Sequence, residues 1–217
     1  MILTHKLPRL KVVRRNEYLI SKCKGRRVLH LGAVDYNNGM VCGLHRALME
    51  VADTVIGIDI DTVGIERAKA EGIQNICYGN LEHLSKVDIQ EKFDVIAAGG
   101  VVEHLSNPGL FLDGVKRFFA PEAEMIIETP NAFSIHRFIL GLLNREYVHS
   151  EHVFYFSYVT LRNLLERHAY LITEEVSHVL GARLTNLIMF IARHNFNFSN
   201  GFIFVVKPRS GGDIYGS

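Results

Sequence analysis

The sequence has 217 residues, enough for one large domain with a substantial core and too few for two ordinary domains with a linker. Hydrophobic residues make up 48% and charged residues 22% of the chain, which excludes a disordered or fibrous protein. The formal net charge of +1 excludes a strong overall field for nucleic acid or an anionic membrane.

The three cysteines indicate a reducing compartment. Cys23, Cys42 and Cys77 are far apart and include no Cys-x-x-Cys pair, which argues against a zinc or redox motif built from cysteine. The first residues, MILTHKLPRLKVVRR, lack the apolar core and cleavage site of a signal peptide, and no apolar run reaches the length of a membrane span. We therefore expect a cytoplasmic protein without a transmembrane segment.

The chain begins with a basic segment. Its first 27 residues contain one acid, Glu17, and nine basic side chains: Lys6, Arg9, Lys11, Arg14, Arg15, Lys22, Lys24, Arg26 and Arg27. Apolar residues such as Val12 and Leu19 give the segment a face that can pack against a domain. We expect a basic leader helix over residues 1–25, with an arm that binds phosphate or lipid as the alternative.

Short apolar runs then alternate with segments of helical periodicity. The sequence predicts seven strands, over residues 27–32, 53–60, 75–79, 93–100, 125–131, 172–180 and 202–207. It predicts helices between them, over residues 39–52, 62–72, 108–120 and 157–170. This alternation is typical of right-handed βαβ units, so we expect an α/β fold with a doubly wound, mainly parallel sheet.

The expected domain spans residues 26–208. Within it, residues 132–156 break the alternation and are rich in aromatic residues and histidine. We expect this segment to be an insertion that forms a lid over the carboxyl edge of the sheet. The Gly-rich residues 209–217 are expected to be a flexible tail.

Two of the predicted strands end in residues suited to a nucleoside-bearing ligand. Gly32 ends VLHLG, where the absence of a Cβ lets a ligand approach the backbone in the crevice of an open sheet. Asp59 lies near the end of VIGIDI, where a carboxylate can accept hydrogen bonds from both ribose hydroxyls. The fuller pattern G-x-G-x-x-G is missing after Gly32, which argues against a dinucleotide.

Five segments carry a family resemblance when they are taken in order: VLHLG, VIGIDI, YGNL, FDVIAAGGVVEHL and MIIETPN. Together they resemble the class I methyltransferases that use S-adenosylmethionine (SAM), nearest to the branch of ubiquinone-biosynthesis O-methyltransferases. The resemblance covers roughly residues 26–170. It implies a Rossmann-like, seven-stranded sheet with the last strand antiparallel, and an enzyme that transfers a methyl group from SAM.

The resemblance also implies a set of cofactor-binding residues: His30, Gly32, Asp35, Asp59, Ile60, Asn80, Leu81 and Gly99. Asn80 and Leu81 would meet the adenine edge, because an amide oxygen can accept a hydrogen bond from the adenine amino group. His30 stands where the family usually has an acid. Asp35 either contacts the amino group of the methionine part or is a turn residue in DYNNG.

Glu103 and His104 are the expected catalytic residues. They follow the fourth predicted strand directly, so we expect them to project into the crevice beside the sulfonium. A histidine with a pKa near neutrality can take the proton from an acceptor hydroxyl, and a neighbouring carboxylate fixes its tautomer.

A divalent metal is a second implication of the resemblance. Some relatives hold one with a Glu-x-x-Glu-His segment and a distant histidine. Here Gly100 stands in place of the first glutamate, while Glu103, His104 and His152 match the other ligands. A metal such as Mg²⁺ is therefore an open alternative to a site without metal. For His149 and His152, the alternative without a metal is a hydrogen-bonded pair in a loop.

The expected function is O-methylation of a small molecule, a glycan or a lipid-linked intermediate with SAM as the methyl donor. Two alternatives stay open. An RNA methyltransferase could use the basic leader, although the charge balance elsewhere disfavours RNA. A binding domain of the same fold without catalysis is the other, because the loop that follows Gly32 lacks the further glycines usual in the family. No DNA partner is expected.

Overall fold

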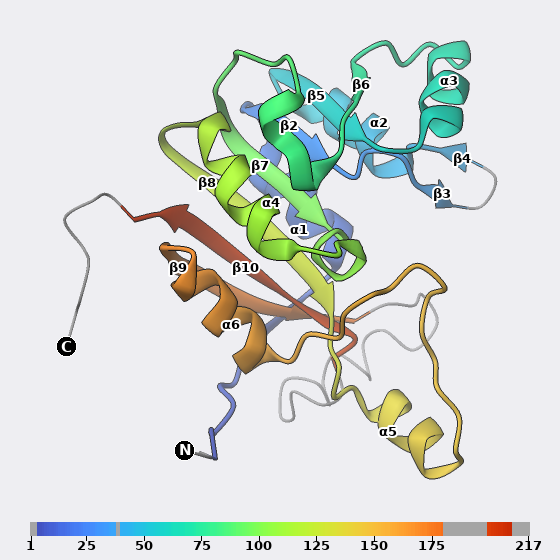
Figure 1. The fold of residues 1–217 in the computed structure, drawn as a ribbon, viewed down its shortest axis with the longest axis vertical. Coiled ribbons are helices and arrows are strands. Elements are labelled where there is room, and N and C mark those ends of the chain that lie inside the picture. The colour runs from blue at the N-terminus through green and yellow to red at the C-terminus, as the bar shows by residue number, and fades with distance from the viewer. Residues whose placement is uncertain (1–3, 38–39, 180–198, 210–217) are drawn as a thin grey trace.

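A computed structural model describes residues 4–37, 40–179 and 199–209. Except for Arg209, the expected tail lies outside these residues. Eight strands form one sheet, in the order β1-β9-β10-β8-β7-β2-β5-β6 (Figure 1). Their bounds are Lys11–Val13 for β1, Arg27–Leu31 for β2, Thr54–Asp59 for β5, Ile76–Tyr78 for β6, Phe93–Gly99 for β7, Phe119–Pro130 for β8, Tyr170–His178 for β9 and Gly201–Pro208 for β10.

The strand directions confirm the predicted fold class. β2, β5, β6, β7 and β8 each run parallel to their neighbours within this group. β10 lies between β8 and β9 and is antiparallel to both. The order reverses beside β2, the first strand of the doubly wound arrangement, so a crevice is expected at its carboxyl end.

The sheet has one strand more than the seven expected, because part of the basic leader joins it. β1 pairs in parallel with β9, with Val12 opposite Ser177. Helix α1 (Arg15–Cys23) follows β1 after a single residue. The leader, expected as one helix over residues 1–25, therefore contains a strand and a helix.

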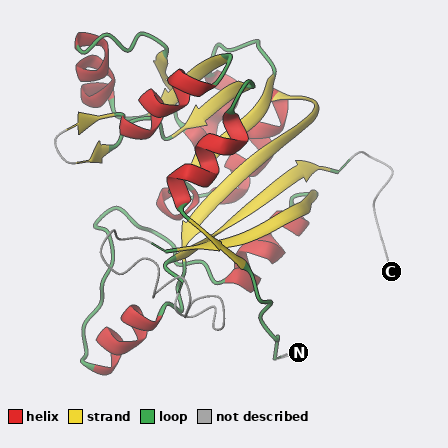
Figure 2. Ribbon diagram, turned by 180° about the vertical axis from the view of Figure 1, so that it is seen from behind, coloured by secondary structure: helices red, strands yellow, loops and turns green. Residues whose placement is uncertain are grey.

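Helices cover both faces of the sheet (Figures 1 and 2). Their bounds are Gly43–Val51 for α2, Thr62–Ala70 for α3, Pro108–Val115 for α4, Ile135–Leu142 for α5 and Tyr158–Arg167 for α6. Apolar side chains of α4 and α6 pack with the strands into the larger hydrophobic cluster, and those of α1 and α2 form a second cluster on the other face. No helix in the described ranges combines the length and apolarity that crossing a membrane requires.

The helix predicted from residue 39 begins later. Strands β3 (Tyr36–Asn37) and β4 (Met40–Val41) form a small antiparallel sheet first. The carboxylate of Asp35 then accepts hydrogen bonds from the backbone N–H groups of Gly43 and Leu44, at 3.1 and 3.2 Å. A carboxylate satisfies the free N–H groups at a helix start, so Asp35 sets the beginning of α2.

A buried carboxylate connects three elements at the carboxyl end of β8. Glu128 is paired with Arg15 of α1, at 2.7 Å from Nε to Oε2, and with His178 of β9, at 2.8 Å from Nε2 to Oε1. Burial by itself opposes ionisation of Glu128, but Arg15 and His178 hold its pKa below the ordinary value. These contacts hold helix α1 against the sheet at the carboxyl end of β8.

Replacement of Arg15 should cost much more stability than replacement of a cation on the same helix whose partner is less buried. We expect Arg15→Met to lower the free energy of unfolding by about 3 kcal/mol, because Glu128 loses its cation in a buried place. Lys22→Met is the matched control, since Lys22 is on the same helix and forms an ion pair with Glu174 that is only partly buried. Its loss should be below about 1 kcal/mol. Urea unfolding measures both, and equal losses would contradict the expectation.

The same pair predicts a pH dependence. The pKa of Glu128 is lower in the folded than in the unfolded chain, so its ionised form stabilises the fold fully above about pH 4.5. This contribution is lost as the pH falls through the folded pKa. The stability difference between wild type and Arg15→Met should therefore shrink as the pH is lowered below about 4.5. A urea unfolding series from neutral to acidic pH tests this, and a constant difference would refute it.

Candidate active site

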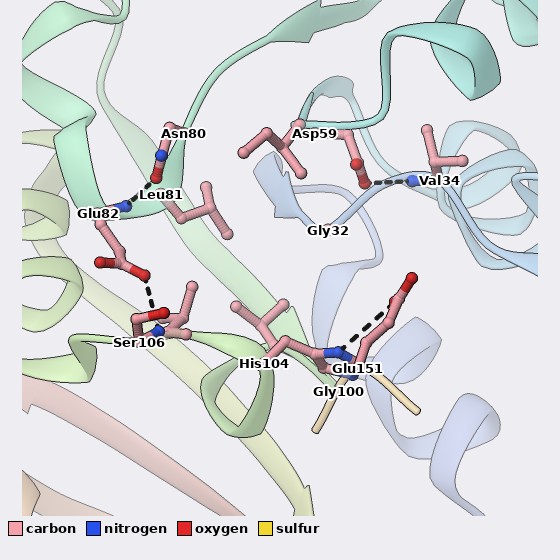
Figure 3. Close-up of a pocket in the computed structure, with 13 residues that line it drawn as sticks. Gly32, Val34, Asp59, Asn80, Leu81, Glu82, Gly100, His104, Ser106 and Glu151 are labelled. Carbon is pink, nitrogen blue, oxygen red and sulfur yellow. Dashed lines mark hydrogen bonds and ion pairs between the residues drawn. The ribbon is translucent and has the colours of Figure 1, made fainter. Parts of the chain in front are cut away.

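A cavity of about 480 Å³ opens at the carboxyl ends of β2, β5 and β7, within the usual size range of small-molecule sites (Figure 3). It is lined by Gly32, Val34, Asp59, Ile60, Asn80, Leu81, Glu82, Gly100, Val101, His104, Leu105, Ser106 and Glu151. In Figure 3, Asp59 and Asn80 lie on one side of the cavity, and His104 and Glu151 on the other. The cavity is where strand reversal places a ligand crevice.

Gly32 is required at the turn between β2 and the cavity for two reasons. Its φ of +68° lies in the left-handed region, and a Cβ at this position would lie 2.8 Å from a methyl carbon of Val101. Its N–H group also donates a hydrogen bond to the carbonyl oxygen of Ile58, at 2.9 Å. The backbone is therefore held open to the cavity at the end of the first strand.

The carboxylate of Asp59 is fixed by backbone donors on both of its oxygens. Oδ2 accepts a hydrogen bond from the N–H group of Val34 at 2.8 Å, and Oδ1 accepts one from Asp61 at 2.9 Å. Burial raises the pKa of Asp59, and these N–H groups oppose that shift. Each oxygen keeps a further lone pair, so the group can still accept hydrogen bonds from a diol.

Asn80 and Leu81 follow β6 and enter the same cavity. The Asn80 side-chain oxygen accepts a hydrogen bond from the N–H group of Glu82 at 2.8 Å and caps the short helix Leu81–Lys86. This is the oxygen expected to meet an adenine amino group, and it retains one lone pair. Leu81 and Ile60 add apolar surface to this side of the cavity.

Five of the eight expected cofactor residues line the cavity, and His30, Asp35 and Gly99 do not. His30 is buried in the core, where its Nδ1 lies 3.1 Å from Nδ1 of His45. Burial, with a smaller contribution from His45, lowers the pKa of His30 to about 3. Gly99 faces Arg15, since a Cβ there would lie 2.8 Å from the guanidinium.

The expected catalytic pair is divided between the cavity and the protein interior. His104 lines the cavity, at the end of the short helix Val102–His104. Glu103 is 2% exposed, and its Oε2 accepts a hydrogen bond from the Thr129 hydroxyl at 3.0 Å. Burial, with the nearby charge of Glu128, raises the pKa of Glu103. Neighbouring residues thus have different surroundings, and only His104 meets the cavity directly.

The segment after α5 brings two more histidines to His104. Ring centres of His104 and His152 are 4.6 Å apart and those of His104 and His149 are 5.6 Å apart. Glu151, which sequence reasoning missed, lies with Oε2 at 3.9 Å from Nδ1 of His104 (Figure 3). Burial lowers the pKa of His104 and that of His152, the latter to about 4, so both rings are neutral near pH 7.

The same segment exposes a series of aromatic and aliphatic side chains. None of the residues of α5 is buried, and the helix projects away from the sheet (Figure 1). Exposed apolar side chains of residues 132–156 are Phe133, Phe138, Ile139, Leu142, Leu143, Tyr147, Val148, Val153, Phe154 and Tyr155. The segment expected as a lid therefore exposes many apolar side chains, and Glu151 is its one residue that lines the cavity.

Comparison with known proteins agrees with this geometry. A family model described as "Methyltransferase domain" matches residues 15–175. Over 137 residues the chain is 29% identical to a ubiquinone biosynthesis O-methyltransferase of Rhodopseudomonas palustris, with 62% of this chain and 51% of the relative aligned. The corresponding enzyme of Nitrobacter winogradskyi is 31% identical over 136 residues, with 62% and 49% aligned. The chain spans about half the length of these curated relatives.

Solved structures share the fold at lower sequence identity. A SAM-dependent methyltransferase from Archaeoglobus fulgidus aligns with a TM-score of 0.59 and 19% identity, over 89% of this chain and 91% of that one. Magnesium protoporphyrin IX methyltransferase from Synechocystis aligns with a TM-score of 0.61 and 12% identity, over 90% and 80%.

The family match covers well over half of the chain, and it includes the strands that form the cavity. The strand order and the position of the crevice agree with it. This chain belongs to the methyltransferase domain family and has the fold of the class I SAM-dependent methyltransferases.

Proposed function

We propose that the protein transfers the methyl group of SAM to an oxygen atom of a small-molecule acceptor. The observation that supports this best is that Asp59 and Asn80 face His104 across the strand ends in one and the same cavity. The names of the curated relatives, at about 30% identity, favour oxygen as the methylated atom.

In this proposal the chain holds SAM along the strand ends. Asp59 would accept hydrogen bonds from the ribose hydroxyls, and Leu81 and Ile60 would border the adenine. The backbone at Gly32, which lines the cavity, would border the methionine part. When bound, SAM supplies a methyl group activated by its sulfonium.

The acceptor would lie on the histidine side of the cavity. A methyl transfer is an in-line displacement, so the chain must align the acceptor oxygen and assist removal of its proton. A neutral imidazole can accept that proton, and His104 is neutral near pH 7 and lines the cavity. Glu103 would act by orienting the loop, because its carbonyl oxygen accepts hydrogen bonds from the N–H groups of Val153 and Phe154.

The apolar segment beside the site favours a ring-bearing or apolar acceptor. Tyr147, Phe154 and Tyr155 are exposed and lie within three residues of His149 or His152 in the chain, and aromatic surface of this kind can exclude water from reacting atoms. Within the expected classes, this favours a small ring-bearing molecule, including a sugar ring or the head of a lipid-linked intermediate.

The basic leader gives less support to an RNA substrate than its composition implied. Four of its nine basic side chains form ion pairs within the chain: Arg14 with Glu17, Arg15 with Glu128, Lys22 with Glu174 and Arg27 with Asp94. A side chain that is already paired has less charge to offer to phosphates. The small-molecule acceptor is therefore the proposal.

The residues implied as magnesium ligands do not fit that ion. Mg²⁺ takes oxygen ligands in near-octahedral geometry. Here Gly100 stands where those relatives have a glutamate, so one carboxylate is missing. Glu103 is buried against Thr129, with its Oε1 4.0 Å from Nε2 of His152. The proposed reaction therefore has no step that depends on magnesium.

Removal of the charge of Asp59 should weaken SAM binding. Asp59→Asn keeps the shape of the side chain, but a neutral acceptor bonds the ribose hydroxyls less strongly. Loss of about 1.5–3 kcal/mol corresponds to a dissociation constant raised roughly 10- to 100-fold. Calorimetry measures it, with Asp94→Asn, at the opposite end of the sheet, as the unchanged control. Absence of SAM binding by the wild type would favour the non-catalytic alternative.

Replacement of His104 should slow transfer without releasing the cofactor. We expect His104→Gln to lower kcat by about 100-fold or more at saturating SAM, with the SAM dissociation constant changed only a few-fold. The assay uses labelled SAM with a panel of catechols and sugars, and mass spectrometry to locate the methyl group. His83→Gln, an exposed histidine after β6, is the control. Undiminished turnover in His104→Gln, or a methyl group on nitrogen or carbon, would overturn the assignment.

A further inference from the structure

Three imidazole rings from two separate parts of the chain converge beside the cavity. His104 follows β7, and His149 and His152 lie in the segment between α5 and α6. One ring nitrogen of each histidine lies within 4.8 Å of the corresponding nitrogens of the other two. Removal of one proton from the acceptor would need only one of these rings. The presence of all three therefore needs another explanation.

The spacing of the rings matches that of three imidazoles around one metal ion. With metal–nitrogen bonds of about 2.0–2.1 Å in tetrahedral geometry, imidazole ring centres are about 5 Å apart. The three distances between ring centres here are 4.6, 5.5 and 5.6 Å. The rings are also inclined to one another, which excludes a parallel aromatic stack.

His152 supplies an independent sign of a missing partner. Its side chain is 10% exposed, and its Nδ1 is a buried atom without a hydrogen-bond partner among the described residues. Buried polar atoms normally have one. Its other nitrogen, Nε2, lies 4.0 Å from the Glu103 carboxylate. Histidines that bind metals usually direct their second nitrogen to such a group.

His149 and the backbone complete the arrangement. The Nδ1 atom of His149 accepts a hydrogen bond from the N–H group of Glu151 at 3.3 Å, so Nε2 is the nitrogen left for a metal. The carbonyl oxygen of Glu103 accepts hydrogen bonds from Val153 and Phe154, at 2.9 and 3.1 Å. These bonds hold the segment that bears His149 and His152 against the turn that bears His104.

We propose that His104, His149 and His152 bind a divalent transition metal of the zinc class at the acceptor end of the cavity. Imidazole nitrogens suit zinc and its neighbours, whereas magnesium prefers oxygen. Three protein ligands leave a fourth position, the arrangement of catalytic zinc sites. His104 lines the cavity, so this position can receive an acceptor hydroxyl. Glu103 is then a positioning residue behind His152 and not a ligand.

The inference rests on the proposed methyl transfer and changes one step of it. A His104 ring that binds the metal does not take the acceptor proton itself, so the metal replaces it in activating the hydroxyl. A cation beside the hydroxyl lowers the pKa of that group. The O–H bond breaks, and the proton passes to solvent or to the exposed carboxylate of Glu151. The oxygen forms a bond to the methyl carbon as the sulfur–carbon bond of SAM breaks, and that electron pair stays on sulfur. A hydroxyl-bearing acceptor with a second oxygen beside it, such as a vicinal diol, is the chemistry favoured.

Metal binding can be measured without any turnover assay. The wild-type protein, freed of any polyhistidine tag and stripped with a chelator, is titrated with Zn²⁺ and with Mg²⁺ by calorimetry. We expect one Zn²⁺ per chain and no binding of Mg²⁺. Co²⁺ should give the visible absorption of a tetrahedral site. His149→Ala should weaken Zn²⁺ binding by more than about 100-fold, and Glu103→Gln by about 10-fold. His83→Ala should leave it unchanged.

The outcomes separate this inference from the proposed function. Absence of Zn²⁺ and Co²⁺ binding by the wild type overturns the metal site, as does full affinity in folded His149→Ala. Full methyl transfer by protein free of metal overturns the role of the metal in activating the acceptor and leaves the proposed function intact. One Zn²⁺ per chain, lost in His149→Ala, supports the site even when no hydroxyl acceptor is methylated, a result that would count against the proposed function alone.

Discussion

The ion pair between Arg15 and Glu128 is the contact on which the functional end of the sheet depends. It joins the N-terminal helix to β8, and His178 adds β9 to the same carboxylate. The guanidinium lies so close to Gly99 that a Cβ there would be 2.8 Å away, which fixes the path of the chain as it leaves β7. The turn that follows bears His104. A charge balanced inside the protein thus sets the position of a side chain that faces the cavity.

All seven predicted strands are present in the structure. They could be predicted because a strand buried on both faces is a continuous apolar run, which is easily recognised in a single sequence. The additional elements lack that signal. β1 has three residues and begins with exposed Lys11, so its pairing with β9 follows from tertiary contacts alone. The small hairpin of β3 and β4 lies where apolar spacing predicted the start of a helix, and Asp35 moves that start to Gly43.

The site was predictable where chain position determines location. Asp59 ends a parallel strand, and Gly32 and Asn80 follow two others, so all three lie where the carboxyl ends of the strands meet at one edge. Side-chain direction was less accessible. His30 lies within β2 and faces the core, against His45 of α2. Contacts between distant segments were hardest, because nothing in HSEHVFYFS states that His149 and Glu151 approach the turn after β7. The hydrogen bonds to the Glu103 carbonyl and the contacts of His104 with His149 and Glu151 reveal that approach.

The pairing of β1 with β9 also affects how the molecule meets its neighbours in a concentrated solution. A long, unpaired edge strand is a template on which another chain can add a strand and begin to aggregate. Without β1, the nine residues of β9 would form such an edge. The described sheet instead ends at β1 on one side and at β6 on the other, each three residues long. Short edges of this kind offer a second molecule few backbone groups, which favours solubility over intermolecular strand addition.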